Sequence, residues 1–219
     1  MARGGTVNWH AEVLNPAAKR AAVRLVPAVS GFYLAGGTGL ALRLGHRVSL
    51  DLDFFSEQNP LKDSDRGLLL EAIRAGGKVE VEQNKDGSLH LLVEGAHISF
   101  IRYPYPLLGT CDKWGDIPVA PVEDIAAMKV SAIIGRGSRK DFVDLYEICS
   151  RTGLEAVLRP VPRKFSGHRD MLLEASRALV YFEDAEKEPM PRLLKRISWE
   201  RVRAYFEKEV PRLVNRLLD

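Results

Sequence analysis

Two aspartates, Asp51 and Asp53, are the residues of this chain best suited to bind a metal ion. They lie two residues apart in residues 48–55, where apolar and polar side chains alternate as in a β-strand, so both carboxylates are expected on one strand face, about 6.6 Å apart along the backbone. Two anions this close repel each other unless a cation lies between them, and Mg²⁺ prefers a few carboxylates together with substrate phosphates. The pair therefore predicts a divalent-metal site; the alternative is the solvated face of an edge strand.

A glycine cluster at residues 36–39, which includes Thr38, comes directly before an apolar segment with helical spacing. The backbone N–H groups and the positive dipole end of a helix N-terminus attract anions, and phosphate suits that geometry. The cluster is neither a Walker A loop nor a GxGxxG motif, because no Gly-Lys-Ser/Thr follows and Leu42 occupies the third glycine position. A phosphate-binding turn and a plain tight turn are the two interpretations.

Lys129 is the single charged residue within residues 125–134, and its helical neighbours three and four positions away are apolar. Its ammonium could extend to the surface, or it could reach into a cleft and hold phosphate oxygens as a point charge. Asp141 and Asp144 follow three residues apart, so they share one face of the next expected helix. They either complement the helix dipole or contribute to a site.

Other kinds of catalytic site are poorly supported by the sequence. The five histidines show no HExxH or other metal-binding spacing, and no serine lies in a GxSxG elbow. Cys111 and Cys149 lack CxxC spacing, so we expect both to be reduced thiols.

The hydrophobic pattern predicts the elements that would position these residues. Helix–strand alternation at the start, followed by an antiparallel three-strand meander at a sheet edge and then by helices, indicates an α+β chain. The expected helices cover residues 8–29, 61–75, 122–134, 139–151, 168–182 and 199–218, the expected strands cover residues 32–35, 48–55, 78–83, 88–94, 97–103 and 117–120, and residues 159–165 are expected to be a Pro-rich linker.

Composition places the chain among ordinary globular proteins. It has 219 residues, of which 46% are hydrophobic and 28% charged, and these values exclude disorder, a collagen-like repeat and a disulfide scaffold. No stretch reaches the roughly 18 apolar residues that a membrane span requires. Residues 1–15 also lack the apolar core of a signal peptide, so we expect a cytoplasmic protein without a membrane partner.

The basic excess lies in the C-terminal part of the chain. Residues 151–219 contain 15 Lys and Arg against 11 Asp and Glu, a net charge of +4, whereas residues 1–150 have a net charge of −1. A polyanion such as RNA could dock on this part by phosphate neutralisation. Helices with interleaved Arg and Glu are also typical of a plain solvated surface.

Taken together, four segments resemble the AbiEii/AbiGii-type nucleotidyltransferases, a branch of the DNA polymerase β-like superfamily that includes toxins of bacterial toxin–antitoxin pairs. The most specific is the run FYLAGGTGLALRLGHRVSLDLDFF at residues 32–55. The others are residues 98–107, which contain Tyr-Pro-Tyr-Pro, residues 124–129, and RKDFVDLY at residues 139–146. The resemblance covers about residues 30–150.

The resemblance implies a polymerase β-like α+β fold with a mixed, mostly antiparallel sheet flanked by helices. Residues 1–120 would form the nucleotidyltransferase core, and residues 121–219 a helical region completing the active-site cleft. The implied activity is Mg²⁺-dependent transfer of NMP from an NTP to an acceptor hydroxyl, with Mn²⁺ as an alternative ion. A tRNA or other RNA 3′ end is the favoured acceptor and a protein the alternative, and the chain would be the toxin of a type IV system with a cognate antitoxin as partner.

The resemblance also assigns roles to individual residues. The implied metal ligands are Asp51 and Asp53, the implied catalytic set is Asp51, Asp53, Lys129 and Asp141, and the implied nucleotide-binding set is Gly36, Gly37, Thr38, Arg47, Ser49 and Lys129. Many relatives carry a third carboxylate on a neighbouring strand, where residues 97–100 of this chain offer Ser99 instead.

Two other functions share parts of this pattern. A phosphohydrolase of the haloacid-dehalogenase type also uses an apolar strand that ends in Asp-x-Asp, followed by a lysine and an acid pair. Against it, a Gly-Gly-Thr helix precedes the aspartates here, and Asp141 and Asp144 lie in a helical pattern. The third candidate is an inactive nucleotide-binding relative that acts as a protein partner.

Overall fold

The computed structural model describes residues 7–218, with side chains as far as residue 214, so the ends of the two expected domains, residues 1–6 and 219, lie outside the described residues. The chain divides into two compact units. The N-terminal unit comprises Met1–Pro106 and Thr110–Ala120, and the C-terminal unit comprises Leu107–Gly109 and Pro121–Asp219.

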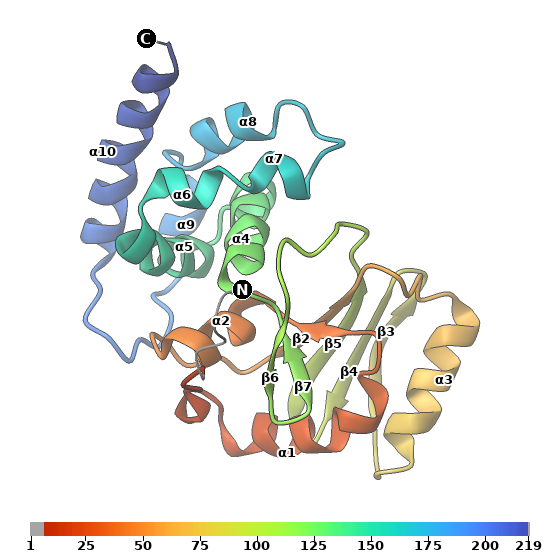
Figure 1. Cartoon of the computed structure of the whole chain (residues 1–219). Coiled ribbons are helices and arrows are strands. Elements are labelled where there is room, and N and C mark those ends of the chain that lie inside the picture. Colours follow the sequence, from red (N-terminus) through yellow and green to blue (C-terminus); the bar gives the residue numbers. More distant parts are fainter. Residues whose placement is uncertain (1–6, 219) are drawn as a thin grey trace. The chain divides into compact units, whose positions relative to one another are not determined.

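Within the described residues of the N-terminal unit, one sheet contains seven strands in the order β3-β4-β5-β2-β1-β7-β6 (Figure 1). The β2–β5 and β1–β7 pairs are parallel and the other pairs are antiparallel, which confirms the predicted α+β fold with a mixed, mostly antiparallel sheet. The strands are β1 (Tyr33–Leu34), β2 (Leu52–Ser56), β3 (Glu80–Lys85), β4 (Ser88–Val93), β5 (Ala96–Arg102), β6 (Asp112–Trp114) and β7 (Ile117–Val119).

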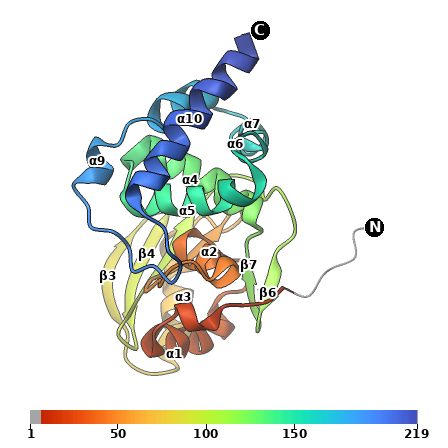
Figure 2. The same cartoon turned by 90° about the vertical axis from the view of Figure 1, so that its left-hand side faces the viewer.

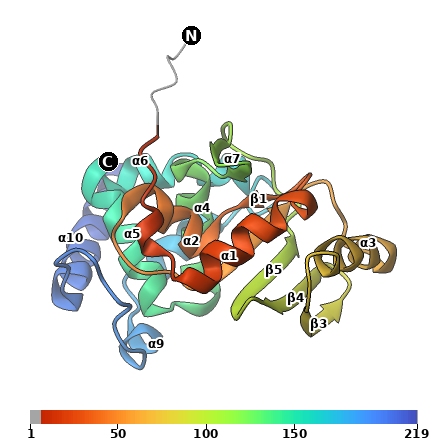
Figure 3. The same cartoon turned by 90° about the horizontal axis from the view of Figure 1, so that it is seen from below.

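One face of this sheet is covered by helices α1 (Pro16–Leu25) and α3 (Asp63–Arg74), which lie on the same side of it in Figure 3. The covered face carries fully buried side chains of the central strands, including Leu52, Phe54 and Phe100. Because side chains alternate along a strand, Asp53 and Phe55 lie on the other face of β2. Burial of the first face therefore sets the orientation of the carboxylate.

The first predicted helix, residues 8–29, is wrong in its extent. A 3-10 turn, η1 (Ala11–Val13), comes first, α1 begins only at Pro16, and a second 3-10 turn, η2 (Val26–Ala28), follows it. The Asn15 side chain accepts a hydrogen bond of 2.7 Å from Ala18 N, so Asn15 caps a helix that has proline in its first turn. The Asn15 cap therefore decides where the helix begins, although the helical spacing of apolar residues extends further towards the N-terminus.

The second predicted strand is also too long, because β2 begins at Leu52 instead of residue 48. Leu50 is 53% exposed, although the alternating pattern predicted that it would face the core, while Ser49 is buried. Ser49 N donates to Val13 O at 3.1 Å, and Leu14 forms an isolated bridge with Ser49. Pairing with the N-terminal segment keeps residues 48–51 out of the sheet.

The described part of the C-terminal unit is helical, and α10 packs against α5 and α6 in it (Figure 2). Phe142 of α5 contacts the rings of Phe182, Trp199 and Phe206, with centroids 5.2–5.9 Å apart. The sequence pattern missed three short helices here, as well as strand β6. The helices are α4 (Val122–Arg136), α5 (Arg139–Thr152), α6 (Leu154–Leu158), α7 (Val161–Lys164), α8 (Met171–Ala178), α9 (Glu183–Glu186) and α10 (Trp199–Leu218).

Residues 159–165 are not a linker, because they contain α7 and bury Val161, Lys164 and Phe165. The Lys164 ammonium lies 2.7 Å from Asp124 Oδ1, and neither side chain is exposed to solvent. Asp124 also accepts hydrogen bonds from the backbone N–H groups of Leu108 and Gly109. A buried ion pair, whose carboxylate also accepts backbone hydrogen bonds, therefore fixes this segment.

Two further sequence predictions concern covalent and membrane chemistry. Cys111 and Cys149 are both reduced, as predicted. Within residues 7–218, no helix combines the length and the apolar character needed to cross a membrane.

The buried Lys164–Asp124 pair generates a stability prediction. Lys164→Met should lower the free energy of unfolding by about 3–5 kcal/mol, because it leaves the Asp124 carboxylate buried without its cation. Lys187→Met, which breaks the exposed pair between Lys187 and Asp184, should change it little. Urea denaturation of both variants measures the difference, and equal losses would contradict the structural role of Lys164.

Candidate active site

The Asp53 carboxylate lies against the first residue of helix α2 (Gly36–Leu44). Strand β1 leads directly into α2, and Ala35 N donates to the Asp53 carbonyl at 3.1 Å. Gly36 has φ +60°, and a Cβ on it would lie 3.1 Å from Asp53 Oδ2. Both the backbone conformation and the close approach therefore require glycine here, and the approach places a carboxylate at the positive end of a helix.

Thr38 connects the first turn of α2 to the residue that precedes β2. Its hydroxyl, in a side chain only 1% exposed, bonds the Asp51 carbonyl and lies 2.7 Å from Ser49 Oγ. Since a carbonyl can only accept, the Thr38 proton goes to Asp51 and the Ser49 hydroxyl donates to Thr38. These bonds hold the Asp51 backbone beside the glycine turn.

Gly37 makes room for a buried guanidinium. A Cβ on Gly37 would lie 2.2 Å from Arg47 Nη2 and 3.6 Å from Ser49 Oγ. The Arg47 side chain is buried, and its Nη1 donates to the Val48 carbonyl at 3.0 Å. The positively charged Arg47 guanidinium therefore lies against the first turn of α2, next to Gly37.

These contacts bring seven sequence-predicted residues together within the N-terminal unit, around the point where β1 leads into α2 (Figure 3). Asp51 is exposed and Asp53 is partly exposed. The arrangement combines a carboxylate pair, which can hold a cation, with a helix N-terminus, which can hold an anion. We call it the glycine–carboxylate cluster, formed by Gly36, Gly37, Thr38, Arg47, Ser49, Asp51 and Asp53.

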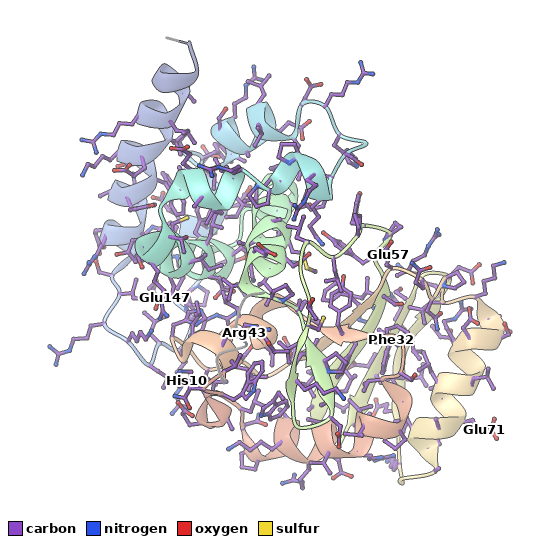
Figure 4. All side chains as sticks on the ribbon, viewed as in Figure 1. His10, Phe32, Arg43, Glu57, Glu71 and Glu147 are labelled. Carbon is purple, nitrogen blue, oxygen red and sulfur yellow. The ribbon has the colours of Figure 1, made fainter. Side chains whose placement is uncertain are left out.

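The far end of α2 is fixed by Arg43, which is labelled in Figure 4. Its guanidinium donates to the Ala120 carbonyl at 2.7 Å, to the Val119 carbonyl at 2.9 Å and to Asp112 at 2.9 Å. These bonds join α2 to β6, β7 and the residue that follows β7. The helix that carries the cluster is therefore tied to the sheet at both of its ends.

Strand β5, which runs parallel to β2, places Ser99 opposite Asp53. The neighbouring strand thus offers a hydroxyl where a third carboxylate would stand. Within the described residues, no group of three or more His, Cys, Asp and Glu side chains could hold a metal. Two carboxylates completed by substrate phosphates still suit Mg²⁺, which usually keeps only one or two protein carboxylates.

His97 feels the negative charge of Asp51, a relation that the sequence analysis missed. His97 Nδ1 lies 2.9 Å from Glu82 Oε2, and this hydrogen bond, with the charges of Glu82 and Asp51, raises the pKa of the imidazole above its ordinary value. The alternation of His97 and Ser99 marks a polar strand face, but only the parallel β2–β5 register brings that face beside the aspartates.

Lys129 and Asp141 meet in a buried network within the C-terminal unit. Lys129 Nζ lies 2.7 Å from Asp141 Oδ1 and 2.6 Å from Asp144 Oδ2, and its side chain is only 5% exposed. The interpretation that its ammonium extends to the surface is therefore wrong. Asp141 also accepts hydrogen bonds from Arg136 and Ser138, so the network ties the end of α4 to the start of α5.

The pKa of Asp141 follows from this network. Burial alone would raise the pKa, but attraction to Lys129 and hydrogen bonds from Arg136 and Lys129 outweigh it and lower the pKa to about 2. The carboxylate is therefore ionised at every pH near neutrality.

The apolar groove of the C-terminal unit, about 360 Å³ in volume, contains none of the candidate residues. Leucine and valine side chains of α6, α8 and α10 line most of it, and Glu155 and Arg159, which pair with each other at 3.2 Å, add charges. Its lining offers little that could bind a triphosphate.

The Asp141 network predicts a pH dependence of stability. Because folding lowers the Asp141 pKa from 3.8 to about 2, the carboxylate contributes about 2 kcal/mol above pH 4, and this is lost as the pH falls through about 2. The difference in unfolding free energy between wild type and Asp141→Asn should therefore shrink as the pH falls from about 5 towards 2. Urea denaturation at stepwise pH tests this, with Asp184→Asn as an exposed control; a constant difference would contradict it.

Comparisons with known proteins agree with this geometry. Residues 21–217 match the family described as "Nucleotidyl transferase AbiEii toxin, Type IV TA system". The uncharacterised protein aq_aa25 of Aquifex aeolicus (strain VF5) is 39% identical over 184 residues, which cover 82% of this chain and 86% of that protein.

Two solved structures share the fold. The nucleotidyltransferase toxin MenT4 of Mycobacterium tuberculosis H37Rv has a TM-score of 0.57 at 20% identity, and the match covers 92% of this chain and 86% of MenT4. ANT(2″)-Ia, solved in complex with adenylyl-2″-tobramycin, has a TM-score of 0.51 at 16% identity, with 68% and 95% covered. The polymerase β-like fold is thereby confirmed. The match to a nucleotidyltransferase family favours nucleotidyl transfer over the phosphohydrolase alternative. The chain belongs to the AbiEii family of nucleotidyltransferase toxins of type IV toxin–antitoxin systems.

Proposed function

We propose that this chain transfers NMP from an NTP to a hydroxyl at the 3′ end of an RNA, with a tRNA as the favoured acceptor and Mg²⁺ as the favoured ion over Mn²⁺. The observation that carries the proposal is the contact between the Asp53 carboxylate and the N-terminus of α2. It places groups suited to a cation and groups suited to a phosphate within one small cluster.

The carboxylates of Asp51 and Asp53 would hold the ion. When bound, it would neutralise charge that develops on the transferring phosphate and on the leaving pyrophosphate. The Thr38 hydroxyl would act indirectly, because its bond to the Asp51 carbonyl holds one of the two ligands in place. Ser49, which bonds Thr38, would support the same segment.

The backbone N–H groups of Gly36 and Gly37, at the start of α2, would bind the phosphates of the NTP. The Arg47 guanidinium beside Gly37 would add positive charge at the same turn. In the transfer step, the acceptor oxygen attacks the α-phosphorus and the bond from that phosphorus to the pyrophosphate oxygen breaks. Asp51, the more exposed carboxylate, would accept the acceptor proton, and positioning and electrostatics would supply most of the acceleration.

Lys129 and Asp141 complete the proposal as a phosphate-binding cation and the carboxylate that positions it. The Lys129 ammonium is not ready to bind phosphate as it stands, because two carboxylates already neutralise its charge. Binding a triphosphate would require the ammonium to exchange at least one of these contacts. Asp141, held by Arg136 and Ser138 as well, would stay in place during that exchange.

The proposal of an RNA acceptor rests on the net charge of +4 in residues 151–219. Several of these cations already form ion pairs, such as Lys195 with Glu147 and Arg203 with Glu186, so the net positive charge matters more for RNA binding than the number of basic residues.

Family membership implies an antitoxin partner. We propose that the cognate antitoxin counteracts this RNA modification.

Asp51→Asn and Asp53→Asn should each abolish nucleotide transfer while leaving the fold intact, because each removes a metal-binding charge at a solvent-accessible position. The assay incubates the protein with total RNA, Mg²⁺ and each of four α-labelled NTPs. Asp116→Asn, a change at an exposed aspartate in the β6–β7 turn, should keep full activity. Circular dichroism and thermal unfolding check the fold of each variant.

Three outcomes would contradict the proposal in different ways. Transfer by Asp51→Asn at the wild-type rate would remove the assigned role of this carboxylate. A covalent aspartyl-phosphate at Asp51 would favour the phosphohydrolase. Binding of Mg²⁺-NTP without release of pyrophosphate would identify an inactive nucleotide-binding protein.

A further inference from the structure

A row of aromatic rings begins two residues after Asp53 on strand β2 and continues onto the residues that follow strand β5. Phe55 follows Asp53 by two residues and therefore lies on the same face of β2. Its ring packs edge-to-face with Tyr103, with centroids 5.5 Å apart, and Tyr103 packs in the same way with Tyr105 at 4.9 Å. On the other side of Phe55 lies the buried ring of Tyr33, at 6.2 Å.

These rings do not belong to the core between the sheet and its helices. The core face of the same strands carries Phe54 and Phe100, which are fully buried and stack at 5.3 Å. Phe55, Tyr103 and Tyr105 lie outside that cluster and each keeps part of its surface exposed. We call these three residues the aromatic row.

The backbone holds the aromatic row in place. Tyr103 N donates to the Ser56 carbonyl at 2.8 Å, which continues the pairing between β2 and β5 one residue beyond the end of β5. Tyr105 N donates to the Tyr103 carbonyl at 2.7 Å, and prolines at positions 104 and 106 restrict the chain on both sides of Tyr105. A ligand that stacks here would meet rings that need little further ordering.

We propose that the aromatic row is a stacking site for a nucleobase. Phe55 follows Asp53 by two residues, which is about 6.6 Å along a strand. This length is comparable with the distance from the phosphate to the base in a nucleotide, which the ribose spans. Aromatic side chains can stack on the flat face of any base. The site would therefore bind a nucleotide without discriminating between the four bases. The inference rests on the proposed function for its location, because the phosphate chemistry is assigned to Asp51 and Asp53.

The base could come from the NTP or from the terminal nucleotide of the RNA acceptor, and binding measurements separate the two sources. In the first arm, calorimetry gives the dissociation constants of Mg²⁺-NTP and of Mg²⁺-tripolyphosphate, a probe without a base. In the second arm, filter binding compares a synthetic RNA that has an intact 3′-terminal base with one whose terminal ribose is abasic. Wild type and Tyr103→Leu are measured in both arms.

Loss of one stacking contact should weaken binding of the base-bearing ligand by about 5- to 150-fold. If the NTP supplies the base, Tyr103→Leu weakens NTP binding and leaves tripolyphosphate binding unchanged. If the acceptor supplies it, the variant binds the intact RNA as weakly as the abasic RNA. Tyr103→Phe and Tyr103→Trp should restore binding in both arms, whereas Tyr181→Leu, a change at an exposed tyrosine in the C-terminal unit, should bind Mg²⁺-NTP as wild type does.

Unchanged binding in both arms, in a folded Tyr103→Leu protein, would overturn the stacking site. Because the arms measure binding alone, they remain informative if the protein transfers no nucleotide. Absence of transfer by wild type would refute the proposed function, while a base-specific loss of binding would still support the aromatic row.

Discussion

The glycine–carboxylate cluster depends on the close approach between the Asp53 carboxylate and the Gly36 backbone. A Cβ at residue 36 would lie 3.1 Å from Asp53 Oδ2, and φ +60° disfavours any residue but glycine there. The approach brings the acidic residues of a strand to the positive end of a helix. Groups that suit a cation and groups that suit an anion therefore lie side by side. The other contacts of the cluster, from Thr38 and Arg47, hold the two elements on either side of this approach.

The orientation of that strand is set by the core. Leu52 and Phe54 bury one face of β2 completely, and a register shift of a single residue would exchange them with Asp53 and Phe55. Such a shift would bury a carboxylate and expose two large apolar side chains. The hydrophobic effect therefore fixes which face carries the carboxylate and the first ring of the aromatic row.

The C-terminal unit uses buried charge in a different way. Lys129 lies between two carboxylates, and Lys164 pairs with Asp124 where neither side chain reaches solvent. Burial penalises each isolated charge, so each pair is retained only because its partner and further hydrogen bonds satisfy it. These contacts constrain the α4–α5 turn and the position of α7, and any role of Lys129 towards phosphate would draw on the same charges.

The sequence by itself determined the family, the strand–turn–helix around residues 33–44, the edge meander and the aspartates at residues 51 and 53, because these features depend on local spacing and on glycine at fixed positions. It placed Asn8 in a helix and Leu50 in the core incorrectly, because the Asn15 cap and the pairing of Ser49 with Val13 compete with periodicity. Only the tertiary structure brought Arg47 over Gly37, set Ser99 opposite Asp53, buried Lys164 and aligned Tyr103 with Phe55. Those contacts join residues far apart in the chain, and strand register and burial, which no local pattern encodes, decide which of them form.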